Sequence, residues 1–369
     1  MTGFIEQFGT ITDPRVDRTK KHKLIDILFN TLSAILCGCD EWEEIESYGQ
    51  KKEPWLRKYL ELPNGIPSHD TFNRTISSID PQVLQERFIS WVQSVVSLSN
   101  GEVVNIDGKR LCSSGKDSKD AIVHMVSAWS DANSMVLGCC KVSDKSNEIT
   151  AIPKLLELLD LSACTITIDA MGCQKQIAKA IVDKQAHYLL AVKENQPRLL
   201  DDIREAFKHH PANDIATNKQ SGLAHGRIEE RSCRVITDMD WICNAGQWAG
   251  LKSIIEITGE RTDKKTGLYQ KEVRYYISDL QQDAESFNRL VRTHWSIENS
   301  QHWVLDVAFN EDASRKRAKN AAENFAMLNR MALNIVKADT STKASIKRKR
   351  KMAGWDDQYL EHLLLNIKN

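Results

Sequence analysis

Five short apolar runs between residues 103 and 192 restrict the folds that this chain can adopt. The runs are 103–106, 122–129, 135–142, 165–168 and 187–192. The first three follow one another closely, whereas each of the last two follows a segment with helical apolar spacing, 148–160 and 173–183. Short connections favour antiparallel pairing, and helical crossovers favour parallel pairing. The sequence therefore predicts a mixed five-stranded sheet with flanking helices.

The order β-β-β-α-β-α-β is that of a ribonuclease-H-like core, which places the chain in the α/β class. Residues 1–99 show helical spacing of apolar residues and no strand pattern, so we expect an all-helical N-terminal domain. Residues 100–196 would form the first part of the core. Strand-like runs within 197–280 predict a β-rich insertion, and residues 281–369 return to helix as the second part of the core.

Positive charge is concentrated near the C-terminus, although the whole chain balances 50 Lys and Arg against 50 Asp and Glu. Between Ser314 and Lys351 there are twelve basic and two acidic residues. Within this segment, one unbroken basic run consists of Lys347, Arg348, Lys349, Arg350 and Lys351. Such a stretch is typical of a surface that binds phosphates, and a solvated basic tail is the alternative.

Cysteine usage and hydropathy indicate the cellular compartment in which the protein works. The nine cysteines include no CxxC pair with zinc-ligand spacing, so we interpret them as reduced thiols that pack in the interior. No apolar run is long enough to span a bilayer, and the first residues lack the basic-then-apolar order of a signal peptide. We therefore expect a cytoplasmic protein that does not contact membranes.

Two aspartates stand directly after predicted strands. Asp107 follows the first strand in VVNIDGK, and Asp169 follows the fourth in TITIDAMG. A carboxylate at the end of a strand in an open α/β sheet faces the crevice where ligands bind. Two such groups close together repel one another unless a cation lies between them, and Mg²⁺ prefers oxygen ligands. The alternative is that each aspartate only caps a turn or a helix.

Glu298 offers a third carboxylate, in the predicted helix of RTHWSIENSQHWVLDV. Helical spacing places it on one face with Val291 and Leu305, so we expect it to point toward a packed surface. A buried carboxylate needs a partner. A metal ion is one candidate, and a salt bridge to Arg292 is the other.

Several other polar residues are candidates for contact with a phosphate backbone. Lys193, Asn195 and Gln196 follow the fifth strand at the same sheet edge as the aspartates, with helix capping by Asn195 as the alternative. His294 and His302 are not in the HExxH arrangement that would bind zinc, so core or DNA-facing roles are expected for them. We count Lys109, Arg292 and His294 among the candidate DNA contacts.

The whole chain resembles the bacterial insertion-sequence transposases of the H-repeat-associated group, which belong to the DDE class. The motifs that carry the resemblance are DPR (13–15), GIPSHDTFNR (65–74), NIDGK (105–109), KSNEITAIP (145–153), TIDAMGCQ (167–174), AVKENQ (191–196), HGRIEER (225–231), HWSIENSQHWVLDVAFNED (294–312) and KNAAENFAMLNRMALN (319–334). A broader branch carries an arginine four residues before the catalytic glutamate and a lysine seven after it. Here these positions hold His294 and Leu305, so those phosphate contacts do not carry over.

The resemblance implies a ribonuclease-H-like catalytic domain interrupted by a β insertion, with a metal-binding triad of Asp107, Asp169 and Glu298. It implies Mg²⁺, with Mn²⁺ as a substitute, and no nucleotide cofactor. The implied partner is double-stranded DNA, both element ends and target, bound by a homodimer whose N-terminal helical domain serves end binding or dimerisation. The expected reaction is phosphodiester hydrolysis followed by strand transfer.

Two alternatives stay open at this point. A domesticated transposase-like protein would keep DNA binding without catalysis, and a nuclease of the same fold would cut DNA without joining it. A nicking assay with Mg²⁺ or Mn²⁺ separates the first from a transposase, and strand-transfer products separate the second.

Overall fold

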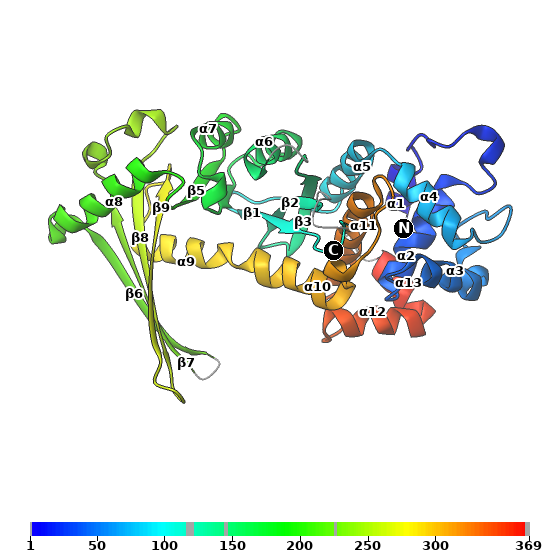
Figure 1. Cartoon of the computed structure of the whole chain (residues 1–369). Helices are drawn as coiled ribbons and strands as arrows, with labels where there is room; N and C mark the ends of the chain where they lie inside the picture. The colour runs from blue at the N-terminus through cyan, green and yellow to red at the C-terminus, as the bar shows by residue number, and fades with distance from the viewer. Residues whose placement is uncertain (1, 116–121, 144–146, 225–226, 366–369) are drawn as a thin grey trace. The chain divides into compact units, whose positions relative to one another are not determined.

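The computed structural model describes residues 2–115, 122–143, 147–224 and 227–365, which form two units (Figure 1). The first unit comprises Met1–Ser97, Gly108–Asn147 and Glu298–Asn369. The second comprises Leu98–Asp107 and Glu148–Ile297. No helix in the described ranges is both long and apolar enough to cross a membrane.

The first unit is mainly helical. Its helices and strands are α1 (Thr2–Phe8), α2 (Leu24–Leu36), α3 (Trp42–Leu56), α4 (His69–Ser78), α5 (Pro81–Gln93), β2 (His124–Ser130), β3 (Met135–Lys141), α10 (Trp303–Phe309), α11 (Ala321–Ala338), α12 (Ile346–Trp355) and α13 (Asp357–Leu365). Helix α2 is apolar on nearly all sides and almost completely buried, as expected for a central helix. Helix α11 packs against α2 and β3. The N-terminal helices therefore share a core with the C-terminal ones.

Polar side chains fix α11 onto the two strands of this unit. The amide of Asn334 accepts from the backbone N–H of Val136 and donates to its carbonyl, both at 2.8 Å. Arg330 is completely buried, donates to Ser127 Oγ at 3.2 Å and pairs with Glu311 at 2.9 Å. These buried hydrogen bonds fix the register of the helix on the two strands.

The second unit holds most of the sheet. Its elements are α6 (Glu148–Leu158), β4 (Thr165–Ile168), α7 (Lys175–Asp183), β5 (His187–Val192), α8 (Pro197–His209), β6 (Ala216–Ala224), β7 (Arg227–Ile236), β8 (Ser253–Asp263), β9 (Tyr269–Ser278) and α9 (Ala284–His294). Strand β1 (Val103–Arg110) begins here, and its residues from Gly108 onward belong to the first unit.

The directions of three strand pairs agree with those predicted from the connections. Strands β1, β4 and β5 are parallel neighbours, while β2 and β3 pair antiparallel across a short turn. Helix α7 is the crossover between β4 and β5, and all four residues of β4 are buried, as is usual inside a parallel sheet. The full hydrogen-bonded order is β3-β2-β1-β4-β5-β9-β8-β7-β6.

The β-rich insertion is a meander of four antiparallel strands, β6 to β9, and β9 pairs with β5 (Figure 1). Three of these strands correspond to the strand-like runs of the sequence, 228–236, 252–259 and 272–277, whereas β6 (ATNKQSGLA) has no apolar alternation and was not predicted. It is the last strand in the sheet order, and edge strands are often polar because they gain little from burial. One face of the meander packs on α9 through an apolar cluster that includes Ile257, Phe287 and Val291.

The helix expected around Glu298 is not continuous. Helix α9 ends at His294, Trp295 lies in a turn, and Glu298–His302 form one π-helical turn before α10 begins. A π turn inserts a residue relative to α-helical spacing and rotates every side chain that follows. Val291, Glu298 and Leu305 therefore do not share one helical face.

Candidate active site

Asp107 and Asp169 occupy equivalent positions on neighbouring parallel strands. The register pairs Ile106 of β1 with Ile168 of β4, and each aspartate is the next residue along its strand. Adjacent strands lie about 4.8 Å apart, and residues at matched positions point to the same side of a parallel sheet. Both side chains are partly buried. The prediction that the two strands are neighbours is confirmed in the second unit, and a metal site shared by the two carboxylates stays a prediction.

The surroundings of Asp169 disfavour its negative charge. Burial raises the pKa of this carboxyl group above its usual value, and the charge of Glu148 at the start of α6 adds to the rise. The backbone N–H groups of Gly172 and Met171, together with Lys193, act in the opposite direction. A cation beside Asp169 would relieve this cost.

Asp169 also caps the short 3-10 turn η2 (Ala170–Gly172), since its carboxylate accepts from the backbone N–H of Met171 at 3.1 Å. The turn ends at Gly172, where a Cβ atom would collide with Ile168 and press against Ile152 of α6 at 3.2 Å. Glycine is therefore required for α6 to approach the turn. The capping role that we considered for Asp169 is real and coexists with its place at the sheet edge.

A buried polar network that was not predicted from the sequence lies two residues before the two aspartates on their strands. Asn105 and Thr167 stand two residues before Asp107 and Asp169, so they point to the same face of the sheet. Thr167 Oγ1 lies 2.6 Å from Asn105 Oδ1 and 2.7 Å from His294 Nδ1. The Asn105 amide nitrogen donates to the Thr293 carbonyl at 3.3 Å and to Ser296 Oγ at 3.1 Å.

These contacts assign the proton on His294. The Asn105 carbonyl oxygen only accepts, so the Thr167 hydroxyl donates to it and must itself accept from His294 Nδ1–H. Burial lowers the pKa of His294 to about 4, and the charge of Arg274 contributes. His294 is therefore neutral at physiological pH and joins the end of α9 to β4, which favours the predicted core role over contact with DNA.

The polar residues after β5 brace the same sheet edge. Asn195 donates to the Ala170 carbonyl at 2.6 Å, and Gln196 donates to the Cys173 carbonyl at 2.8 Å. Both contacts hold the turn that follows Asp169, and neither is the helix cap weighed for Asn195. Lys193 is exposed at this edge and stays a candidate for phosphate contact.

Glu298 is exposed, contrary to the expectation that it points toward a packed surface. It is the first residue of the π-helical turn and the first residue of its segment in the first unit. The alternative pairing with Arg292 is not observed in the described part of the chain, where Arg292 is exposed and has no ion pair. Short π-helical segments occur frequently at functional sites.

Lys109 is an internal ion-pair partner rather than a surface cation. Its side chain is 7% exposed and its Nζ lies 2.6 Å from Asp306 and 3.0 Å from Asp312. Burial alone would lower its pKa, but these carboxylates hold the pKa above the usual value. Lys109 thus ties the end of β1 to the segment that follows the π turn, and the expected DNA contact does not fit this position.

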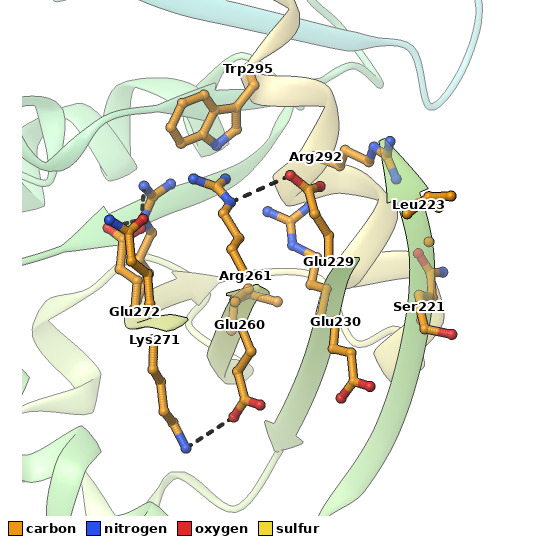
Figure 2. Close-up of a pocket in the computed structure, with 17 residues that line it drawn as sticks. Ser221, Leu223, Glu229, Glu230, Glu260, Arg261, Lys271, Glu272, Arg292 and Trp295 are labelled. Atoms are coloured by element: carbon orange, nitrogen blue, oxygen red, sulfur yellow. Dashed lines mark hydrogen bonds and ion pairs between the residues drawn. The ribbon is translucent and has the colours of Figure 1, made fainter. Parts of the chain in front are cut away.

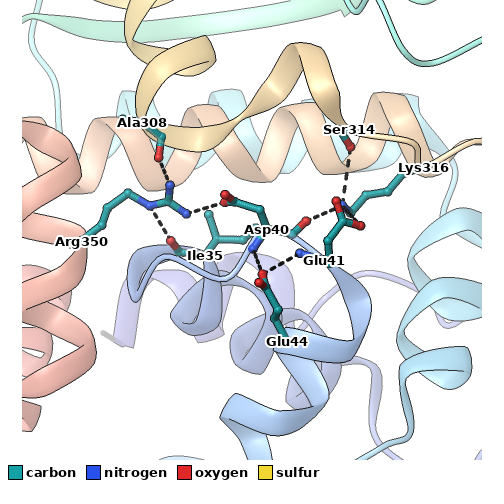
Figure 3. A network of polar contacts seen from close by, with 8 residues as sticks. All are labelled: Ile35, Asp40, Glu41, Glu44, Ala308, Ser314, Lys316 and Arg350. Carbon is teal, nitrogen blue, oxygen red and sulfur yellow. Dashed lines mark hydrogen bonds and ion pairs between the residues drawn. The ribbon is translucent and has the colours of Figure 1, made fainter.

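The C-terminal basic run divides into buried and exposed members. Arg350 is 2% exposed, donates to the carbonyls of Ile35 and Ala308, and pairs with Asp40 at 2.8 Å (Figure 3). Lys349 is 5% exposed and pairs with Asp339 at 3.3 Å. These two residues join α12 to the rest of the first unit. The predicted DNA-binding run is therefore narrowed to its exposed members, Lys347, Arg348 and Lys351.

The same network holds Lys316, a member of the basic segment by sequence. It donates to the Asp40 carbonyl and lies 3.4 Å from Glu41 (Figure 3). Its Nζ also lies over the ring of Phe325, 4.1 Å from the ring centre. Some of the positive charges in this part of the chain are therefore buried and paired inside the first unit.

Oxygen ligands for a hard cation are present at the sheet edge, in Asp107 and Asp169. Within the described ranges, no three His, Cys, Asp or Glu side chains gather into a group that could hold a metal ion. Glu298 belongs to the first unit, whereas both aspartates belong to the second.

Comparisons with known proteins identify the family. The model of a DDE_Tnp_1-associated domain matches residues 5–92, and that of the transposase DDE domain matches residues 93–335. The chain is 44% identical to "Putative transposase YncI" of Escherichia coli O157:H7, over 98% of this chain and 94% of that protein. It is 39% identical to "H repeat-associated putative transposase YhhI" of Escherichia coli (strain K12), over 98% and 97%.

One solved structure, a piggyBac transposase synaptic complex with hairpin DNA, aligns with 98% of this chain and 77% of its own. The identity is 11% and the TM-score 0.43, a level that does not establish a shared fold. The family models and the full-length relatives agree with one another and with the motifs at the sheet edge. The chain therefore belongs to the DDE transposase family, in its H repeat-associated group.

Proposed function

We propose that this protein cuts DNA at the ends of an insertion sequence and joins the released 3′ ends to target DNA. The observation that carries the proposal is the pair Asp107 and Asp169, at matched positions on adjacent parallel strands of a DDE-family chain. Strands β1 to β5 with α6 and α7 would form the ribonuclease-H-like core. The parallel pairing of β1, β4 and β5 supports this assignment.

The donors at the sheet edge fit a divalent cation. Two carboxylates on neighbouring strands supply hard oxygen ligands, and the raised pKa of Asp169 indicates a site that favours a nearby positive charge. Asp107, Asp169 and Glu298 would hold Mg²⁺ or Mn²⁺. When bound, such an ion lowers the pKa of a coordinated water or 3′-hydroxyl and offsets charge on the phosphate under attack.

The chain's own residues position these carboxylates. The Asn105–Thr167–His294 network joins β1, β4 and the end of α9, and so fixes the backbone from which both aspartates project. Asn195 and Gln196 brace the turn after Asp169. Catalytic groups have to be held within a fraction of an ångström, and shared hydrogen bonds of this kind supply that precision.

DNA would be held mainly through its phosphates, by exposed cations such as Lys193, Arg292, Lys347, Arg348 and Lys351. Cutting two element ends and joining both to one target requires two active sites, so a dimer on DNA is part of the proposal.

The test is a cleavage and joining assay. The full chain is incubated with Mg²⁺ or Mn²⁺ and labelled DNA carrying the flanking ends of its own gene. Asp107→Asn and Asp169→Asn should each abolish nicking and joining, whereas Asp160→Asn, at an exposed position before β4, should not. Nicks without joined products would indicate a nuclease, and binding without nicks would indicate a catalytically silent relative.

A further inference from the structure

The face of the meander that packs on α9 changes from apolar to charged side chains along its strands. Near α9 the facing residues are apolar, as in the cross-strand pair Cys233 and Ile257. Two residues further along β7 and β8, the pair is Arg231 and Gly259, and the next is Glu229 and Arg261. Helix α9 ends at His294, so this charged part of the face extends beyond the helix that covers the apolar part.

This charged part forms the floor of a groove of about 690 Å³ (Figure 2). Residues of β6 line the groove as well, and so do Arg292 and Trp295 at the end of α9. All lining residues belong to the second unit. The groove does not include Asp107 or Asp169, so it is distinct from the proposed catalytic carboxylates.

The arginines of the groove outnumber the carboxylates on the same face. Glu272 forms a bidentate ion pair with Arg274, with hydrogen bonds of 2.7 and 2.9 Å. The Arg274 guanidinium lies over the Trp295 ring, 4.5 Å from the ring centre. Glu229 lies 3.6 Å from Arg261. Both acids on this face therefore already have a partner.

Arg231 and Arg292 are left without a carboxylate. In the described part of the chain neither guanidinium forms an ion pair or a hydrogen bond, although both residues line the groove. Burial lowers the pKa of Arg231, Tyr276 acts in the opposite direction, and the nearby charges of Arg292, Arg274 and Arg261 lower the pKa further. Such a partly buried guanidinium among other cations is stabilised by an anion.

Gly259 leaves room for that anion on the groove floor. It lies between Arg231 on β7 and Glu272 on β9, and a Cβ atom added there would meet no atom within 4 Å. A glycine inside a strand often marks a place where a ligand or another backbone approaches closely. The floor is therefore open next to the cations without a partner.

We propose that this groove, which we call the insertion groove, binds the phosphodiester backbone of DNA, with Arg231 and Arg292 as its phosphate contacts. A guanidinium presents a planar fork that matches a phosphate, and two of them on facing elements suit successive phosphates of one strand. The choice of DNA over an acidic peptide rests on the proposed function. The contact fixes DNA on the insertion without reading its sequence.

The first experiment measures the affinity of the full chain for a labelled duplex of arbitrary sequence, with EDTA present so that cleavage plays no part. Arg231→Gln with Arg292→Gln should weaken binding about tenfold and reduce the salt dependence by about 0.9 per lost phosphate contact. The matched control is Arg198→Gln with Arg204→Gln. Helix α8, which carries both, packs through Phe207 on the opposite face, as the contact of Phe207 with Arg234 shows.

The second experiment uses the space at Gly259. Gly259→Lys should tighten DNA binding and Gly259→Glu should weaken it, with equal melting temperatures, because both side chains enter open space. Affinities that follow the sign of the charge support the insertion groove. The opposite result is that wild type binds DNA while neither the double arginine variant nor the two Gly259 variants change the affinity. That result would overturn the proposal that the insertion groove binds DNA and would leave the proposed function standing. If wild type itself binds no DNA, both proposals fail.

Discussion

Buried Lys109 and half-buried Asp306 form an ion pair of 2.6 Å between the end of β1 and helix α10. Lys109 stands two residues after Asp107, and Asp306 lies two helical turns after Glu298. The segment that follows the π turn is thus fastened to the part of β1 that belongs to the first unit. This gives a lysine of the NIDGK motif a structural role that does not require contact with DNA.

Metal binding should stabilise the folded protein. If Asp107 and Asp169 share a cation, adding Mg²⁺ or Mn²⁺ at a hundredfold excess over Kd contributes about 2.7 kcal/mol and raises Tm by several degrees. Asp107→Asn removes one ligand and also the repulsion that the ion relieves, so its metal-induced shift should be much smaller. The measurement is a thermal melt with and without metal. Equal shifts in the two proteins would remove the case for a shared site.

We expect Arg350 to stabilise the fold. We expect the exposed residues of the same basic run to contribute to DNA affinity instead. Arg350→Met leaves Asp40, whose side chain is 25% exposed, without its partner and removes the donor to the Ile35 and Ala308 carbonyls. Breaking a fully buried pair costs about 3–5 kcal/mol, so a somewhat smaller loss is expected here, measured by urea unfolding. Replacing Lys347, Arg348 and Lys351 with Gln should leave the unfolding free energy nearly unchanged and flatten the salt dependence of DNA binding. A stable Arg350→Met protein would show that the interior network in Figure 3 contributes little.

Stability should fall in acid partly because of His294. Its pKa is about 4 in the folded chain and near 6.5 when unfolded, so between these values the unfolded state binds the extra proton. The stability contributed by neutral His294 is therefore complete above about pH 6.5 and is lost as the pH falls toward 4. Tm measured from pH 7 to pH 4.5 should drop less in His294→Gln than in wild type. Parallel pH profiles would contradict the buried, neutral state of His294.

The sequence predicted the parts of the fold that depend on local pattern and connection length. Apolar runs followed by Asp107 and Asp169 identified two strands that are neighbours in the sheet, since a crossover helix leaves few other arrangements. Strand β6 was missed because a polar edge strand lacks the alternation that periodicity detects.

The site was harder to predict than the fold, since charge in a sequence does not indicate burial. Arg350 and Arg348 are two residues apart in one basic run, yet the first is buried against Ile35 and the second is exposed. The predicted orientation of Glu298 was wrong because it assumed continuous α-helical spacing, which the π turn interrupts. The His294 contact to Thr167 joins residues more than a hundred positions apart, and a single sequence carries no signal for such a pair.

Strand transfer by Glu298→Gln tests the central claim most directly, because this substitution keeps the side chain's shape and removes only its charge. Glu298 is exposed, so the variant should fold and bind element ends like wild type. As a metal ligand, Glu298 should be worth several kcal/mol in the transition state, so joined products should form at least about a hundredfold more slowly. Glu285→Gln, an exposed acid in the first turn of α9, is the matched control and should join DNA normally. Strand transfer by Glu298→Gln at the wild-type rate, with Asp107→Asn and Asp169→Asn inactive, would contradict the assignment of Glu298 as the third carboxylate.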